Sequence, residues 1–507
     1  MTGKRANGIL LHISSLPGDY GIGTLGKEAY RFVDLLAKAG QTYWQILPVC
    51  PVGKGNSPYH SFSSFAGNAA FIDPVALCDL GYLTEDELKA ATLSGDPDKV
   101  DFAAVKASRN TLFATVYPRF IAAPPRNFAD FCRDNAAWLD DYALFMAIRE
   151  KSGDLPLQEW DADIRTRQPQ ALDAWRSRCS DRVSYHQMLQ YLFTRQWKAL
   201  KDYANRSGIH IIGDLPIYVS ADSADVWASP HLFQLDENGQ PSPVAGCPPD
   251  AFSEDGQLWG NPVYDWDAMR RDGYRWWLER LAAGQRLYDV IRIDHFRAFA
   301  GYYTIPTDAK NARCGKWRVG PGMAFWRAVK KHFGTIPIIA EDLGHLTPDV
   351  YKLVRDSGFP GMKVLQFAFD PSGESEYLPH RYDKNCVVYT GTHDNDTILG
   401  WADSADEEEV AFAMNYLCAT DRDSLRENML CAAMKSVANT CILTLQDLCA
   451  LGSEARMNTP STVGGNWSWR MRAESLTPQV VQWLYKHTRL YGRLPDGHTK
   501  EEALWQA

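Results

Sequence analysis

The chain has 507 residues, 45% of them hydrophobic, and its 53 basic against 62 acidic residues give a formal net charge of −9. No stretch approaches the roughly 18 apolar residues that span a bilayer, and Lys and Arg form no block. Neither a membrane nor a nucleic acid is therefore predicted as a partner. Eleven cysteines are scattered without a Cys-x-x-Cys pair, and the first residues lack the features of a signal peptide. Both observations predict reduced thiols and a cytoplasmic location.

Eight short apolar runs, each bounded by turn residues, are predicted to be β-strands. They cover residues 8–12, 43–48, 210–215, 289–294, 337–342, 362–367, 387–393 and 441–447. Helical patterns lie between them or after the last, at residues 27–39, 184–206, 267–287, 324–333, 347–357 and 478–491. Unbroken apolar strands that alternate with helices are typical of parallel strands covered on both faces. Eight such strands predict a closed (β/α)8 TIM barrel.

The spacing of the predicted strands is uneven. Residues 83–180, between the second and third strands, have mainly helical patterns and are predicted to form an inserted helical subdomain. Residues 216–266, after the third strand, are rich in Pro, Gly and aromatic residues, and are predicted to form an inserted loop subdomain over the active site. Only about 16 residues follow the last helix, so no C-terminal β-domain is expected. The whole chain, 1–507, is predicted to be a single catalytic barrel.

Carboxylates recur at the C-terminal ends of the predicted strands, where active sites of such barrels lie. Five of the eight ends carry one, namely Asp214, Asp294, Glu341, Asp394 and Asp447. A single acidic residue there can simply cap the next helix. A cluster of oxygen ligands could also bind Mg²⁺ or Ca²⁺, but the sequence has no phosphate loop or basic cluster to accompany such a metal. We therefore predict no metal, and expect catalysis by the carboxylates themselves.

The stretch VIRIDHFRAF, residues 290–299, places two charges in an apolar strand. Side chains alternate along a strand, so Arg292 and Asp294 share the face that points into the barrel, and Ile291 and Ile293 face the covering helices. An arginine within hydrogen-bonding reach is expected to lower the pKa of Asp294 and keep it ionised. An ionised carboxylate suits a nucleophile, which makes Asp294 the predicted nucleophile.

A second carboxyl group with a raised pKa would complete the machinery for cleaving a glycosidic bond with retention. Glu341 ends an apolar strand in IPIIAEDL, where desolvation should raise its pKa and leave it able to donate a proton. Asp394 and His393 follow the seventh strand in YTGTHDND. They could supply hydrogen bonds to sugar hydroxyl groups that strengthen in the transition state.

These motifs closely resemble a known family. GILLHISSLPGDYGIGTLG, SPYHSFSSFAGN, GDLPIYV, DVIRIDHFRAF, IIAEDLG, YTGTHDNDT and GSEARMNTPSTVGGNWSWR are similar, in order, to motifs of the 4-α-glucanotransferases, also called amylomaltases or disproportionating enzymes. These enzymes form glycoside hydrolase family 77 in the α-amylase clan. The resemblance runs from residue 8 to residue 472 and therefore covers most of the chain.

The resemblance implies a role for each matching residue. Asp294 would be the nucleophile, Glu341 the general acid/base and Asp394 the transition-state stabiliser. The implied substrate-binding residues are Tyr59, Asp214, Asp250, Trp259, Arg292, His393 and Asn466. The implied substrates are malto-oligosaccharides and α-1,4-glucans, and no cofactor is implied. The chain departs from the family pattern at His60, usually Gln, and at Ala298, usually Gly, so the shape of the sugar site is expected to differ there.

The resulting prediction is a 4-α-glucanotransferase. It would transfer a glucan segment to the 4-hydroxyl of an acceptor glucose or maltodextrin, by a retaining double displacement through a covalent glycosyl-enzyme. Two alternatives stay open at this point: an amylase-like hydrolase, in which water replaces the acceptor, and an inactive glucan-binding protein. The sequence leaves the oligomeric state, the chain-length preference and the formation of cycloamyloses open.

Overall fold

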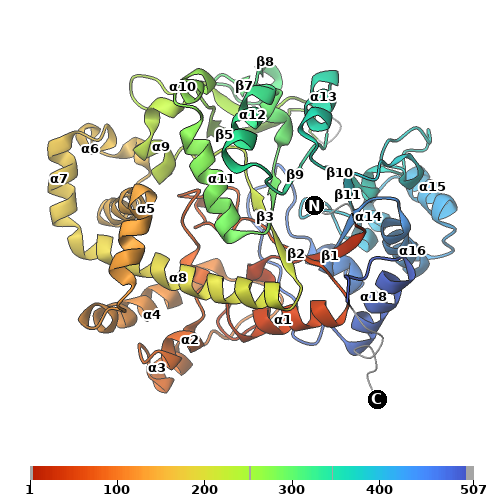
Figure 1. Cartoon of the computed structure of the whole chain (residues 1–507), viewed down its shortest axis with the longest axis horizontal. Helices are drawn as coiled ribbons and strands as arrows, with labels where there is room; N and C mark the ends of the chain where they lie inside the picture. Colours follow the sequence, from red (N-terminus) through yellow and green to blue (C-terminus); the bar gives the residue numbers. More distant parts are fainter. Residues whose placement is uncertain (1–3, 250–252, 345, 498–507) are drawn as a thin grey trace.

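The computed structural model describes residues 4–249, 253–344 and 346–497 (Figure 1). Eight parallel strands form its centre. They are β1 (Ala6–Leu10), β2 (Tyr43–Gln45), β3 (His210–Leu215), β6 (Val290–Ile293), β9 (Ile338–Ala340), β10 (Gly361–Val364), β11 (Cys386–Tyr389) and β12 (Thr440–Thr444). All eight predicted strands are present, although most are shorter than predicted because their C-terminal residues already belong to the following loop or short helix. The predicted (β/α)8 barrel is confirmed.

The strands follow the order β10-β11-β12-β1-β2-β3-β6-β9 around the barrel. The gap between β9 and β10 is bridged by two hydrogen bonds rather than by a regular ladder. The amide of Ala340 donates to the carbonyl of Pro360 at 2.9 Å, and the amide of Met362 donates to the Asp342 carboxylate at 2.7 Å. A side chain thus takes the place of a backbone acceptor where the barrel closes.

Helices cover the outside of the barrel (Figure 1). They include α1 (Lys27–Lys38), α8 (Ser180–Arg206), α11 (Arg275–Leu287), α12 (Gly322–Phe333), α13 (Pro348–Ser357), α14 (Ile398–Ser404), α15 (Glu407–Leu417), α16 (Arg422–Lys435), α17 (Leu445–Leu448) and α18 (Pro478–Leu490). In α1 the buried residues Ala29, Phe32, Val33 and Leu36 recur every three or four positions, so one apolar stripe packs on the strands.

The prediction of one helix at 267–287 is wrong in one respect, because this segment forms two helices. α10 (Trp266–Arg271) ends before Gly273 and Tyr274, whose φ angles of 74° and 63° are left-handed, and α11 starts afterwards. A right-handed helix cannot pass through left-handed residues. Gly273 tolerates this conformation readily, whereas the bulky Tyr274 is held in it with a buried ring.

Residues between β2 and β3 form a group of helices at one side of the molecule (Figure 1). They are α2 (Pro74–Asp79), α3 (Glu85–Ala90), α4 (Phe102–Ala122), α5 (Phe128–Lys151), α6 (Ala162–Arg165) and α7 (Pro169–Arg178). α5 packs along α8, and a shared cluster of buried aromatic and aliphatic side chains joins this group to the barrel. The division of 83–180 as a separate subdomain remains a prediction.

A second, antiparallel sheet has the strand order β5-β4-β7-β8. Two of its strands, β4 (Val244–Cys247) and β5 (Gln257–Pro262), come from the segment predicted to be a loop subdomain, which also contains α9 (Ala224–Ala228). The other two, β7 (Gly301–Ile305) and β8 (Lys316–Val319), follow β6. The sequence analysis did not predict this pairing, because β8 has only four residues, Lys-Trp-Arg-Val, whose alternation is too short to indicate a strand, and all four are exposed.

Candidate active site

The strand ends bring a connected group of polar side chains together. Arg292, buried in β6, lies between two carboxylates: its Nη1 atom is 2.6 Å from Asp214 Oδ2 and 3.1 Å from Asp294 Oδ1. The side chain of Asp214 is fully buried, whereas that of Asp294 remains 28% exposed. Ile291 contacts Gly284 of α11, as expected for a residue on the opposite face of β6. Asp294 is therefore the member of this trio that is open to a substrate.

The pKa of Asp294 is raised well above its ordinary value, and the prediction of a lowered pKa is wrong. Burial is the main cause, and the negative charges of Asp214, Glu341 and Asp394 add to it. Arg292 acts in the predicted direction but offsets only part of these effects. For Arg292 itself, burial opposes the charge, but Asp214 and Asp294 raise its pKa well above the usual value, so it stays cationic.

Glu341 follows β9. Its carboxyl group is linked to the Asp294 loop by a hydrogen bond from the backbone of His295, the residue after Asp294. His295 donates its amide to Glu341 Oε2 at 2.6 Å, and Leu343 donates its amide to Oε1 at 2.9 Å. His295 adopts a left-handed conformation with φ 51°, which turns its amide toward Glu341. Burial raises the pKa of Glu341, in the predicted direction, while Arg292 and the two amides lower it in part.

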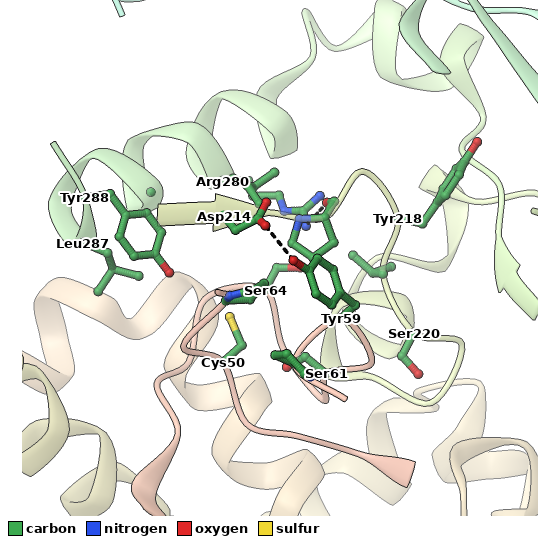
Figure 2. Close-up of a pocket in the computed structure, with 16 residues that line it drawn as sticks. Cys50, Tyr59, Ser61, Ser64, Asp214, Tyr218, Ser220, Arg280, Leu287 and Tyr288 are labelled. Carbon is green, nitrogen blue, oxygen red and sulfur yellow. Dashed lines mark hydrogen bonds between the residues drawn. The ribbon is translucent and has the colours of Figure 1, made fainter. Parts of the chain in front are cut away.

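Three aromatic rings form one wall of the site. The rings of Tyr59 and His393 are stacked with centroids 5.1 Å apart, and Trp467 lies 5.7 Å from Tyr59 and 5.9 Å from His393. The Tyr59 hydroxyl donates to Asp214 Oδ2 at 2.7 Å, which fixes the ring (Figure 2). Burial lowers the pKa of His393, so its imidazole is neutral at pH 7. Trp467 was not singled out in the sequence, although it follows Asn466 in GGNW.

Asp394 extends from the loop after β11 toward solvent, with 47% of its side chain exposed. Its Oδ2 atom lies 3.4 Å from His393 Nε2. Its Oδ1 atom accepts a hydrogen bond of 2.6 Å from the side-chain amide of Asn458, and its carbonyl accepts one from Arg456. Sequence reasoning also missed Asn458, because an asparagine 64 residues away carries no local signal of contact with Asp394.

The other predicted site residues have different surroundings. Trp259 on β5 packs edge-on against His295, with centroids 4.9 Å apart, and so lies beside the backbone that holds Glu341. The described hydrogen bonds of the Asn466 side chain stay within its own loop, to Thr459 and Thr462. Asp250 lies outside the described residues.

Asp447 does not join the cluster. It belongs to α17, and its two oxygens accept hydrogen bonds from the Thr390 hydroxyl and from the amide of Ile398, at the start of α14. The expectation that its carboxylate converges with the others is therefore wrong, because both of its oxygens serve to anchor neighbouring loops.

The two positions that depart from the family pattern lie around the site rather than in it. The ring of His60 is within 3.5 Å of the Ser220 hydroxyl, which links the loop after β2 to the loop after β3. Ala298 is buried within a short 3-10 helix, Phe296–Phe299, that follows the Asp294 loop. Their effect on sugar binding stays a prediction.

A small cavity lies behind Tyr59 and Asp214, with Cys50, Arg280 and Tyr288 also in its lining (Figure 2). Its volume of about 30 Å³ accommodates water but not a sugar ring. The side chains of Asp294 and Asp394, in contrast, are partly exposed to solvent. Among residues 4–249, 253–344 and 346–497, no three His, Cys, Asp or Glu side chains are arranged to hold a metal ion. Within the same ranges, no helix is long and apolar enough to cross a membrane.

The fold and this site together define a class of enzyme. A (β/α)8 barrel whose strand ends present paired carboxylates, a guanidinium and stacked aromatic rings is equipped to break and form glycosidic bonds. Comparison with known proteins narrows this class. Residues 11–477 match the family model described as 4-alpha-glucanotransferase.

Individual relatives agree with the family model. The chain is 47% identical to the 4-alpha-glucanotransferase of Streptococcus pneumoniae serotype 4 over 494 residues, which cover 97% of this chain and 98% of that one. It is 45% identical to that of Thermus thermophilus, with coverage of 94% and 96%. The solved structure of an amylomaltase from Streptococcus agalactiae in complex with acarbose superposes with a TM-score of 0.95, at 43% identity, over 97% of this chain and 100% of that one.

The chain belongs to the 4-α-glucanotransferase family. It is an enzyme that transfers segments of α-1,4-glucans, and the predicted activity is confirmed at this level.

Proposed function

We propose that the enzyme works by a retaining double displacement in which Asp294 is the nucleophile and Glu341 the general acid/base. Asp294 attacks the anomeric carbon, the bond to the leaving glucan breaks, and the proton of Glu341 passes to the leaving oxygen. Glu341 then takes the proton of an acceptor 4-hydroxyl, whose oxygen displaces Asp294 from the same carbon. The observation that carries this assignment is the Arg292 guanidinium 3.1 Å from Asp294, with Glu341 held by the amide of the residue next to the nucleophile.

The contact of Arg292 with Asp294, rather than the pKa shifts of the two carboxyl groups, supports these separate roles. Burial raises the pKa of both, which favours retention of a proton within the cluster. Arg292 contacts Asp294 directly, so the negative charge is best placed there and the proton on Glu341. Both Glu341 oxygens accept a hydrogen bond from a backbone amide. Each oxygen keeps a second lone pair, so Glu341 can exchange a proton with the glycosidic oxygen while the two amides hold its carboxyl group in place.

The remaining residues would bind sugar around the scissile bond. Asp394 and His393 would accept and donate hydrogen bonds at ring hydroxyl groups, while Tyr59, Asp214 and Arg292 form the floor of the same sugar site. Trp259, Asp250 and Asn466 would line the donor and acceptor sites, as the resemblance implies. The segment 216–266 would cover the site and favour a sugar acceptor over water.

Malto-oligosaccharides and α-1,4-glucans are the proposed substrates, since the similar Streptococcus agalactiae amylomaltase was solved with acarbose bound.

We also propose that the enzyme acts in the cytoplasm. All eleven cysteines are free thiols, a state typical of reducing compartments.

Incubation with maltotriose tests the balance between transfer and hydrolysis. We expect a ladder of longer maltodextrins together with free glucose, because a transferase moves glucosyl segments without consuming water. The products can be separated by chromatography and the reducing ends counted. An increase in reducing ends that matches the bonds broken would identify a hydrolase instead.

Asp294→Asn tests the nucleophile. The amide has the same shape but cannot form the glycosyl-enzyme, so transfer should fall by at least about 10⁴-fold while acarbose still binds. Turnover is measured with maltotriose and binding by calorimetry, with Asp308→Asn as an exposed control. Unchanged turnover in Asp294→Asn would refute the assignment, and loss of both turnover and acarbose binding would indicate a misfolded variant, to be checked by its melting curve.

A further inference from the structure

We propose that Asn458 is a positioning residue that holds Asp394 in its working orientation. The inference rests on the proposed role of Asp394 as the carboxylate that stabilises the transition state. Asn458 lies in the segment after α17, which follows the eighth strand of the barrel, whereas Asp394 lies in the loop after the seventh. The loop of one strand thus determines how the catalytic carboxylate of its neighbour is oriented.

Asn458 makes two contacts with the 393–394 segment. Its side-chain amide donates to Asp394 Oδ1 at 2.6 Å, and its backbone amide donates to the carbonyl of His393 at 3.1 Å. Arg456 strengthens the same junction, because its guanidinium donates to the carbonyl of Asp394 at 2.8 Å and to the carbonyl of Asn458 at 2.9 Å. Three of these hydrogen bonds connect two segments that are more than 60 residues apart in sequence, and the fourth, from Arg456 to Asn458, braces the second segment internally.

Asp394 needs an external support because its own loop provides little. Its side chain is 47% exposed, and its second carboxylate oxygen, Oδ2, lies 3.4 Å from His393 Nε2. An exposed carboxylate with no firm partner samples several rotamers, and fixing one of them costs conformational entropy. With Asn458 bound to Oδ1, that entropy is lost when the protein folds rather than when the sugar reaches its transition state.

The chemistry of the amide also suits this task. Asn458 offers a neutral N–H donor, which holds the Asp394 carboxylate without placing a positive charge beside it, as a lysine or arginine would. Because the donor occupies Oδ1, the Oδ2 edge beside His393 is the one left for ring hydroxyl groups. Asn458 thus acts through Asp394 and is not expected to touch substrate.

Two variants separate positioning from folding. Asn458→Ala removes the donor, and Asn458→Asp keeps the shape but places a second carboxylate against Asp394. We expect both to lower kcat for maltotriose transfer by roughly 10- to 100-fold and to change KM by less than about 3-fold, because the support matters most in the transition state. Val463→Ser, in the same loop with a side chain that is 97% exposed, serves as the matched control and should retain full activity.

A double-mutant cycle tests whether Asn458 acts through Asp394. Acarbose affinity is measured by calorimetry in the wild type, Asn458→Ala, Asp394→Ala and the double variant. We expect Asn458→Ala to weaken binding by roughly 10-fold in the wild type and by less than about 2-fold once Asp394 is absent. Equal losses in the two backgrounds, or an unchanged kcat in Asn458→Ala, would overturn the inference.

The cycle also distinguishes this inference from the proposed function. A wild-type protein that neither rearranges maltotriose nor binds acarbose would refute the proposed function and the inference together. A wild type that does both, with additive losses in the cycle, would refute the role of Asn458 alone. Should Asn458→Ala fail to fold, Asn458→Ser keeps a short donor and a similar backbone, and the same kcat and acarbose criteria apply to it.

Discussion

Arg292 connects the residues on which the chemistry depends. One guanidinium nitrogen contacts both Asp214 and Asp294, and the Tyr59 hydroxyl shares the same Asp214 oxygen. Replacement of Arg292 would leave several carboxylates close together in a partly buried site, where like charges raise each other's pKa. The pKa of Asp294 is raised even with Arg292 present, first because of burial and then because of the neighbouring carboxylates. The substrate therefore binds at a site that contains more carboxyl groups than basic groups.

A second buried carboxylate, outside the site, gives a test of stability against pH. Asp225 in α9 accepts the amide of Ser64, but burial raises its pKa from 3.8 to about 6. Because the folded state then binds the proton more tightly than the unfolded state, stability falls as pH rises from about 4 to about 6 and stays lower above that. The loss amounts to about 3 kcal/mol for the full shift.

Asp225→Asn should remove this dependence. We expect the Tm of the variant, relative to the wild type, to increase between about pH 4 and about pH 7, because an amide does not titrate. Differential scanning calorimetry across this range checks it, with Asp308→Asn as an exposed control. A Tm difference that is constant with pH would contradict the raised pKa of Asp225.

At the scale of elements, strand ends and helix ends determine where side chains point. The barrel strands have only three to six residues, so the residues that follow each of them are free to turn toward the central axis. His295 and Tyr274 are two examples at the ends of elements, because both are non-glycine residues with a left-handed backbone conformation. The first turns an amide toward Glu341, and the second separates α10 from α11.

The C-terminal end of α15 offers a stabilising change. Cys418 follows the helix with φ 55° and ψ 40°, and its backbone amide donates to carbonyls of the last turn. The residue is exposed, so a glycine there would relieve the left-handed strain without leaving a cavity. We expect Cys418→Gly to stabilise the protein by about 1 kcal/mol.

Thermal melting checks this prediction, with Cys418→Ala as the matched control. Alanine also removes the thiol but keeps the Cβ atom that makes the left-handed conformation costly. An equal rise in Tm for both variants would show that the thiol, rather than the backbone conformation, limits stability at this position.

At the scale of the whole molecule, buried arginines join the ends of the chain. The side chain of Arg493 is fully buried and donates to the carbonyls of Ala6, Met434, Ser436, Ala438 and Asn439. Arg5 reaches carbonyls in the same loop and that of Tyr491. The first strand, the loop before β12 and the segment after α18 are therefore held together by two guanidinium groups.

Arg493→Lys should destabilise the barrel strongly. A lysine keeps the charge, but its single ammonium cannot reach five carbonyls arranged around a planar fork, and the unpaired groups stay buried. We expect a loss of roughly 3–5 kcal/mol in the free energy of unfolding, measured by denaturant titration. Arg489→Lys, an exposed position at the end of α18, is the control and should change stability by less than about 0.5 kcal/mol. Similar stability of the two variants would contradict this role of Arg493.

The sequence by itself determined the eight parallel strands, the barrel and the positions of Asp294, Glu341 and Asp394 at its strand ends. These features follow from local patterns, because the alternation of apolar runs and helices repeats along the chain and strand ends of a barrel meet at one rim. The motifs shared with 4-α-glucanotransferases pointed to the family, which the relatives confirm.

Only the tertiary structure decided which residues meet there and how they are charged. Asp447 was separated from the cluster, and β7 was paired with β4 on one side and β8 on the other, through contacts between distant segments. Asn458 was brought to Asp394 from 64 residues away. The upward shift in the pKa of Asp294 likewise depends on burial and on carboxylates at the ends of three other strands. Neither a long-range neighbour nor the polarity around a buried group is encoded in any short stretch of sequence, since both exist only once the barrel has closed.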